Sequence, residues 1–209
     1  MTTETRQKII NTAIDLFNQY GSSNVSTNHI AAAMDISPGN LYYHFHNKEE
    51  IIQAIFEGMV ADMDRVWQFQ PAFSLKNLVE LAFQTIEGLA RYHFFQRETI
   101  PLMQRDPILK ARYLEVQQYR LAQLEALLQH FVTSGLLAQS PNPLVMPSLA
   151  KACWMIGDRW LFMLDLEGKA PTRDNIAEGI LLILLLLQPY LIQQGKEEFT
   201  HLIQNLEER

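Results

Sequence analysis

The residues best suited to chemistry in this chain of 209 lie in one stretch, residues 26–48, with the sequence S-T-N-H-I-A-A-A-M-D-I-S-P-G-N-L-Y-Y-H-F-H-N-K. Leu41 and Phe45 are four residues apart and share one helix face, which leaves Tyr42 and Tyr43 facing outward. A solvated helix face usually carries Lys, Glu and Gln. Phenol, imidazole and amide groups can instead bind phosphate oxygens and base edges. This face therefore indicates a nucleic-acid contact surface.

The same stretch places His44 and His46 near Glu49 and Glu50, a set that could suggest a metal site. Histidines at i and i+2 on a helix point about 200° apart, so they cannot share one metal ion. The single cysteine, Cys153, can form neither an internal disulfide nor a zinc site alone. The sequence also lacks a nucleophile elbow, a phosphate loop and a Cys/His cluster. We therefore expect no enzyme, no bound metal and no cofactor.

Two short helices joined by a tight turn are needed to present these side chains. Ser26 or Thr27 can cap the first helix, and Ser37 can cap the second, with Pro38 at its first position. Asp35-Ile36 forms the connection. The pattern predicts a helix-turn-helix. The alternative is a small three-helix unit in a larger domain, in which the tyrosines are merely half-buried.

The composition predicts an all-α protein, because 29 leucines stand against seven valines and neither Asn-Gly nor Asp-Gly occurs. Periodicity and caps predict helices at about residues 5–20, 27–34, 38–45, 48–69, 75–95, 98–104, 107–134, 145–166, 173–194 and 196–208. We expect an N-terminal three-helix domain over residues 1–57, with a fourth helix, 48–70, connecting it to a larger α-helical domain over 58–209.

The most apolar run, residues 179–187, is shorter than a membrane span. With flanks to Ile192 it reaches about fourteen residues and includes Gln188 and Pro189, whereas a spanning helix needs about twenty. The N-terminus has no apolar h-region of a signal peptide. We therefore expect a cytoplasmic protein, with a membrane helix as the alternative.

Residues 4–57 resemble the N-terminal DNA-binding domain of the TetR/AcrR family of bacterial regulators. The matching positions are Ile9, Ala13, Leu16, Phe17, Gly21, Thr27, Ile30, Ala31, the run 36–45, Lys48 and Glu49. Residues 58–209 are similar to the family in size, helix count and apolar final helices. The resemblance implies a homodimeric regulator, usually a repressor of a palindromic operator, that leaves DNA when a small ligand binds its C-terminal domain.

The resemblance also implies nine DNA-contacting residues. Those expected at phosphate are Thr27, Tyr43 and Lys48, and those expected at or near bases are Asn28, Ser37, Gly39, Asn40, Tyr42 and His44. The chain departs from the family at two places. Asn28-His29 stands where many members have an apolar residue and an acid, and Met34-Asp35 replaces the common small residue and glycine.

The apolar final helices imply a partner. Residues 145–166 and 173–194 would form a four-helix interface with a second copy, although a fully internal helix is the alternative. A small hydrophobic or amphipathic effector would occupy a mainly apolar cavity. The candidate lining residues are Phe95, Met103, Tyr113, Tyr119, Trp154 and Asp158. Asp158 and Arg159 form either a structural ion pair or part of this pocket.

The charge opposes a nucleic-acid binder, since such proteins usually carry a basic face. The net charge is −6, and residues 1–57 hold three basic against six acidic residues. Neutral donors can still bind phosphate. We therefore expect a shallow salt dependence, and affinity that rises as pH falls through about 6.5 if His29, His44 and His46 face DNA. An α-helical interaction protein that does not bind DNA is the competing hypothesis.

Overall fold

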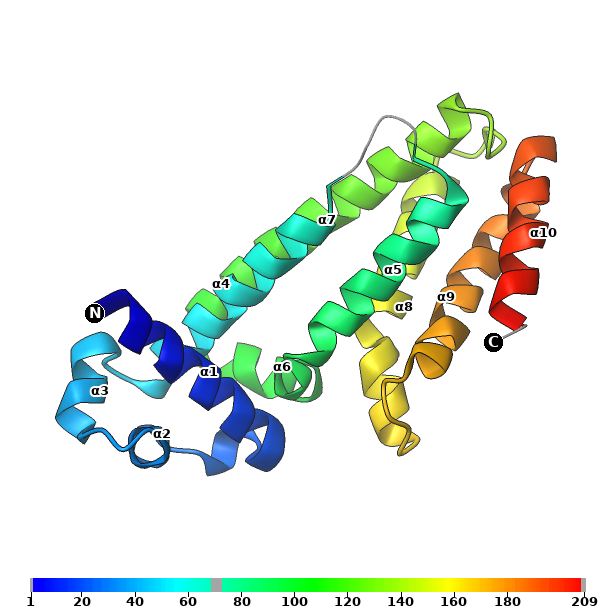
Figure 1. The fold of residues 1–209 in the computed structure, drawn as a ribbon. Coiled ribbons are helices and arrows are strands. Elements are labelled where there is room, and N and C mark those ends of the chain that lie inside the picture. The colour runs from blue at the N-terminus through cyan, green and yellow to red at the C-terminus, as the bar shows by residue number, and fades with distance from the viewer. Residues whose placement is uncertain (1, 69–72, 208–209) are drawn as a thin grey trace. The chain divides into compact units, whose positions relative to one another are not determined.

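The computed structural model describes residues 2–68 and 73–207, and in them all regular structure is helical, as predicted. Figure 1 shows the α-helices α1 (Thr2–Tyr20), α2 (Thr27–Ala33), α3 (Pro38–His44), α4 (Lys48–Val66), α5 (Leu75–Ala90), α6 (His93–Arg105), α7 (Pro107–Thr133), α8 (Val145–Leu166), α9 (Arg173–Leu187) and α10 (Gln193–Glu207). Two 3-10 helices, η1 (Ser22–Asn24) and η2 (Gln188–Tyr190), complete the set. None of the helices in these residues combines the length and apolarity that a bilayer crossing requires.

The chain folds into two compact units. The first comprises residues 1–65 and 91–112, and the second comprises residues 66–90 and 113–209. The first unit therefore extends past residue 57 and includes α6. The division of functions between residues 57 and 58 stays a prediction.

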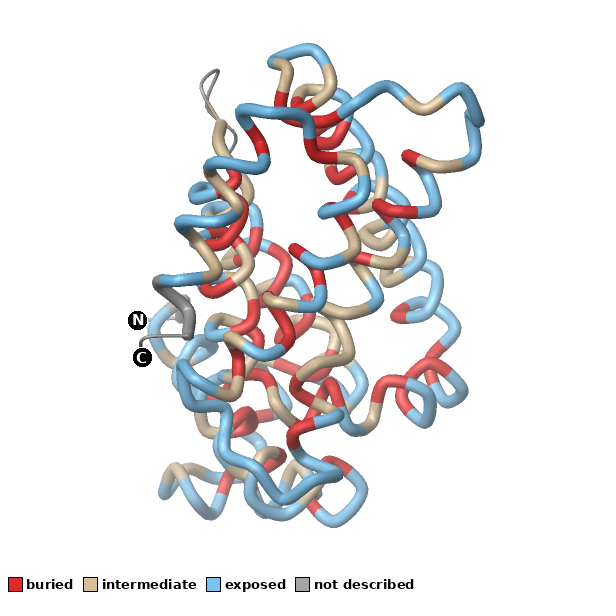
Figure 2. The backbone as a smooth tube through the Cα atoms, turned by 90° about the vertical axis from the view of Figure 1, so that its right-hand side faces the viewer, coloured by how far each residue is buried: buried red, intermediate tan, exposed pale blue. Residues whose placement is uncertain are grey.

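The first unit is built around an apolar centre to which α1, α2 and α3 each contribute. Phe17, Ile30, Leu41 and Phe45 are almost fully buried, and α2 packs against both α1 and α3. Along the helices, buried residues alternate with exposed ones (Figure 2). Tyr20, the last residue of α1, is exposed and is followed by the left-handed Gly21 (φ +80°).

Helix α6 also belongs to the first unit, and its start corrects a prediction. The expected helix over residues 75–95 is interrupted at Arg91-Tyr92, and α6 runs from His93 rather than from about residue 98. The side chain of Asn18 explains the break. It donates to the carbonyl of Arg91 at 2.9 Å and accepts from the N–H of Phe94 at 2.9 Å. One amide therefore satisfies backbone groups on both sides of the interruption.

In the second unit, α5, α8, α9 and part of α7 pack around an apolar core that includes Phe131, Ala150 and Leu187. Helices α5, α9 and α10 run side by side in Figure 1, in agreement with their contacts. Helices α8 and α9 are in close contact at Gly179, where an added Cβ would lie 2.5 Å from Cδ2 of Trp160. Glycine is required there by the neighbouring indole.

Three further helix boundaries differ from the prediction. The helix expected over 173–194 ends at Leu187, because Pro189 lacks a backbone donor and the chain passes through η2. Gly195, expected to precede the last helix, lies inside α10, where an added Cβ would collide with the carbonyl oxygen of Leu136. The helix expected over 48–70 ends at Val66. Its predicted last residues, 69 and 70, lie outside the described residues.

Candidate nucleic-acid interface

The first helix of the motif, α2, is started by a reciprocal pair of side chains. Ser26 accepts from the backbone N–H of His29 at 3.2 Å, and Nδ1 of His29 accepts from the N–H of Ser26 at 3.3 Å. This capping box satisfies two donors that a helix start would leave without a partner. His29 therefore has a local structural role.

The turn between α2 and α3 passes through Asp35, which adopts φ +53°. Its position is the one at which many family members have glycine. Aspartate tolerates this left-handed conformation better than most residues. The backbone N–H of Ile36 then donates to the carbonyl of Ala31 at 3.0 Å, which closes the turn. The departure from glycine thus leaves the helix-turn-helix intact.

Helix α3 divides its faces as predicted. Ser37 caps it by accepting from the N–H of Asn40 at 3.2 Å. Leu41 is fully buried, whereas Tyr42 and Tyr43 are 46% and 74% exposed. Tyr43 is therefore largely exposed and Tyr42 about half exposed, and the choice between a DNA-contacting motif and a simple three-helix unit stays a prediction.

Most predicted DNA-contacting residues lie on the surface of α2 and α3. Those classed as exposed are Asn28, Ser37, Gly39, Asn40, Tyr42 and Tyr43, and those of intermediate exposure are Thr27, His44 and Lys48. The structure brings two of them into contact across the helices, with the hydroxyls of Thr27 and Tyr42 3.2 Å apart. On α3, the ring of His44 meets that of Tyr43 edge-on, with centroids 5.1 Å apart.

Lys48 is engaged within its own unit. Its Nζ donates to the carbonyl of Ser22 at 2.6 Å and to that of Val25 at 3.1 Å. These bonds join the start of α4 to the loop before α2. An ammonium has three N–H donors, so one donor remains for another partner.

His46 does not lie on the helix assumed for the metal argument, because α3 ends at His44 and Phe45 is already extended. The backbone N–H of His46 donates to Oε2 of Glu50 at 2.8 Å, and its ring lies 3.1 Å from the same oxygen. The backbone bond lowers the pKa of the Glu50 carboxyl. In the part of the chain that the structure describes, no group of three or more His, Cys, Asp and Glu could hold a metal ion.

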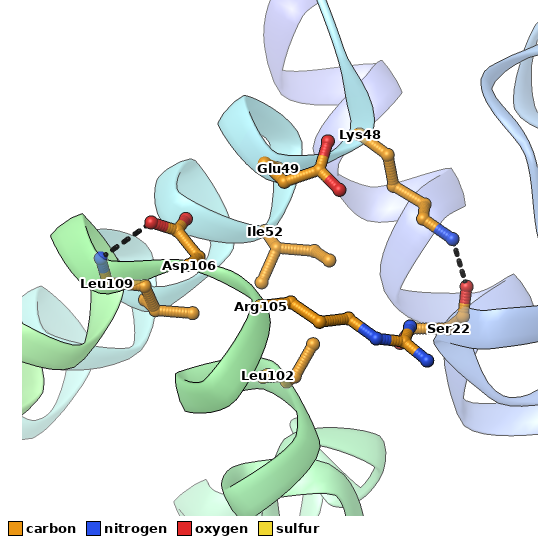
Figure 3. A pocket seen from close by; sticks show the side chains of 8 residues that line it. All are labelled: Ser22, Lys48, Glu49, Ile52, Leu102, Arg105, Asp106 and Leu109. Atoms are coloured by element: carbon orange, nitrogen blue, oxygen red, sulfur yellow. Dashed lines mark hydrogen bonds between the residues drawn. The ribbon is translucent and has the colours of Figure 1, made fainter.

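A small pocket opens beside Lys48 in the first unit. Its lining residues are Ser22, Lys48, Glu49, Ile52, Leu102, Arg105, Asp106 and Leu109 (Figure 3). Its volume is about 20 Å³, room for about one water molecule. The Asp106 carboxylate accepts from the N–H of Leu109 at 3.0 Å and so caps α7. The pocket is too small for an organic effector.

The six effector candidates fall into different units. Phe95 and Met103 are buried in the first unit, and Phe95 stacks on Phe56 with ring centroids 5.3 Å apart. The other four, Tyr113, Tyr119, Trp154 and Asp158, belong to the second unit. Tyr119 is exposed, whereas Trp154 packs against the apolar core.

Two of these candidates meet around Arg159. Its Nε lies 3.0 Å from Oδ2 of Asp158, and its Nη2 donates to the hydroxyl of Tyr113 at 3.4 Å. Burial raises the pKa of the Asp158 carboxyl and that of Tyr113, the latter to about 12. The cluster thus combines a structural ion pair with polar groups in a mainly apolar domain.

Sequence reasoning missed Glu98, which holds the loop before α2 from α6. Its carboxylate accepts from the backbone N–H of Ser22 at 2.9 Å and from the Ser22 hydroxyl. The two residues are 76 positions apart. Neither helical periodicity nor a cap signal joins positions so distant, so only the fold reveals this contact.

Two family profiles match the chain, one described as "Bacterial regulatory proteins, tetR family" over residues 9–55 and one as "Bacterial transcriptional repressor" over residues 58–199. A solved TetR-family transcriptional regulator from Marinobacter aquaeolei VT8 is 30% identical, with a TM-score of 0.86 over 97% of this chain and 98% of that one. The SmeT–triclosan complex shares the fold, with 20% identity and a TM-score of 0.67 over 91% of this chain and 93% of SmeT.

The HTH-type transcriptional regulator UidR of Escherichia coli (strain K12) is 33% identical over 97 residues, or 46% of this chain. That match spans about half of the relative, 48% of its length. Both family profiles and the Marinobacter structure describe regulators of transcription rather than enzymes. With the helix-turn-helix geometry, these matches show that the chain belongs to the TetR family of bacterial transcriptional regulators.

Proposed function

We propose that this chain is a ligand-responsive transcriptional repressor that binds a palindromic DNA operator as a homodimer in the cytoplasm. The observation that carries the proposal is the division of α3, which buries Leu41, followed by the buried Phe45 directly after the helix, and exposes Tyr42 and Tyr43. A recognition helix places such side chains in the major groove. The proposed contacts are Thr27 and Tyr43 at phosphate, and Asn28, Ser37, Gly39, Asn40, Tyr42 and His44 at or near bases.

The homodimer is supported by apolar side chains left exposed on α8 and α9. They are Met155, Met163 and Leu166 on α8, and Leu182 and Leu185 on α9. Exposed apolar patches often mark interfaces. Pairing of both helices with the same helices of a second copy would bury these side chains. A twofold dimer of this kind matches a palindromic operator.

The effector is supported by the cluster of Tyr113, Asp158 and Arg159 in the second unit. Ligand sites in proteins are mainly apolar, with a few polar groups that orient the ligand. SmeT, which shares the fold, was solved with triclosan. We infer a small amphipathic effector whose polar group hydrogen-bonds to this cluster.

The test is a gel shift with a duplex covering the region upstream of the gene that encodes the chain, compared with a scrambled duplex of the same composition. We expect specific retardation at low salt without ligand, and release by some members of an amphipathic compound library. Absence of any specific shift would overturn the regulator function in favour of an interaction protein. If the chain binds the duplex specifically and no compound changes that binding, the ligand response is contradicted and the DNA-binding function stands.

A further inference from the structure

Ser22 is the residue at which three segments of the first unit meet. It is 1% exposed, and its three hydrogen-bonding groups all have partners. Its N–H and hydroxyl donate to the Glu98 carboxylate on α6, and its carbonyl accepts from Nζ of Lys48 on α4. Bonds to charged groups are stronger than neutral ones. Helices α4 and α6 therefore both hold the loop between α1 and α2.

The second bond of Lys48 extends this hold to the edge of α2. Nζ donates to the carbonyl of Val25 at 3.1 Å, and Val25 directly precedes Ser26, the N-cap of α2. Val25 is itself buried. Figure 3 shows the Lys48 side chain extended toward the Ser22 loop. Lys48 therefore holds the residue that directly precedes the N-cap of α2.

The loop is also shaped to admit the Glu98 side chain. Gly21 adopts φ +80°, and an added Cβ there would lie 3.1 Å from Oε1 of Glu98. A side chain at this position would be strained by the backbone and crowded by the carboxylate. Gly21 therefore leaves room for the carboxylate, and Ser22 binds it, so that the loop and α6 are joined although they are distant in sequence.

We propose that Glu98 and Lys48 are positioning residues for DNA binding. They hold residues 21–25 so that α2 presents Thr27 and Asn28 to DNA. The inference rests on the proposed function. It also changes the role of Lys48, from the phosphate contact implied by family resemblance to support of the loop.

The salt dependence of binding separates these two roles, because each neutralised phosphate adds about 0.9 to the slope of log K against log salt. The probe is the upstream duplex, titrated with wild type, Glu98→Ala, Glu98→Gln and Lys48→Met. Arg105→Met, which removes a positive charge from the same pocket, is the matched control. Circular dichroism must show each variant folded at the assay temperature, which separates positioning from loss of stability.

We expect Glu98→Ala and Lys48→Met each to raise the dissociation constant at least about tenfold, with an unchanged salt slope, because each removes two hydrogen bonds to a charged group and one such bond alone accounts for about tenfold. Glu98→Gln keeps one acceptor oxygen and should raise the dissociation constant by less. It is also the variant to measure if Glu98→Ala does not fold. Arg105→Met should bind as wild type does.

Wild-type affinity in folded Glu98 variants would overturn the inference, as would a slope lowered by about 0.9 in Lys48→Met. An Arg105→Met effect equal to that of Lys48→Met would overturn it too, since the cause would then be charge alone. If wild type binds no duplex, the proposed function fails and the inference fails with it. If wild type binds and the variants bind equally well, the inference alone fails.

Discussion

The hydroxyl oxygens of Thr27 and Tyr42 lie 3.2 Å apart and join α2 to α3. Both side chains belong to the proposed DNA-contacting set, one on each helix of the motif. Because either oxygen can donate, the pair can adjust to a phosphate oxygen placed beside it. Contacts made from α2 and from α3 are thus linked through one hydrogen bond.

A double-mutant cycle tests this link. We expect Tyr42→Phe and Thr27→Val each to weaken binding of the upstream duplex, and the double variant to weaken it by less than the sum. The coupling should be about 0.5–1.5 kcal/mol, the net value of one hydrogen bond. Tyr20→Phe, at an exposed tyrosine of α1, is the control. Fully additive effects would contradict the link.

Asp35→Gly should stabilise the protein. Asp35 has φ +53°, a conformation in which a residue with a Cβ is less stable than glycine. We expect the free energy of unfolding to rise by a net of about 0.5–1 kcal/mol, because relief of the left-handed strain exceeds the entropy that glycine restores to the unfolded chain. Urea unfolding measures it. Ala32→Gly, at an exposed position inside α2, should instead destabilise.

Leu182→Lys with Leu185→Lys should dissociate the proposed homodimer. Both side chains are exposed on α9, and two buried charges without partners would strongly disfavour the interface. Sedimentation velocity should show a dimer for wild type and a monomer for the variant. Ile100→Lys, at an exposed apolar residue of α6, is the control. A wild-type monomer, or a variant that stays dimeric, would contradict the interface.

Asp158 should make stability fall as pH rises. Burial raises its pKa above the ordinary value of 3.8. Between pH 3.8 and the folded pKa, the folded state therefore binds more protons than the unfolded state. Stability from this group is full below pH 3.8 and decreases up to its folded pKa. The unfolding free energy of wild type minus that of Asp158→Asn should therefore decrease as pH rises above 3.8. A difference that increases would contradict this direction.

The helix-turn-helix could be predicted from sequence because its signals are local. Ser37 is three residues from the N–H that it caps, and Leu41 and Phe45 are one helical turn apart. The break between α5 and α6 could not, because it depends on Asn18, 73 residues from Arg91. Gly195 looked like a helix boundary and is instead a close contact with Leu136. Long-range packing decided both cases.

The site shows the same limit. Exposed tyrosines on α3 followed from spacing alone, but the partners of Lys48 and the role of Glu98 required the fold. The net charge of the N-terminal domain also changes once the residues that fold with it are counted. Residues 91–112, which join the first unit, bring five basic against two acidic residues. The charge of the folded unit is therefore closer to neutral than that of residues 1–57.

The central claim is that α3 recognises a DNA sequence. Its most direct test compares the affinities of the wild-type chain for the upstream duplex and for the scrambled duplex, with Asn40→Ala and Tyr43→Ala measured in parallel. We predict at least about a 10³-fold preference for the upstream duplex, a preference reduced by Asn40→Ala, and binding to both duplexes weakened by Tyr43→Ala. Equal affinity of wild type for the two duplexes, or binding that neither substitution changes, would contradict the claim.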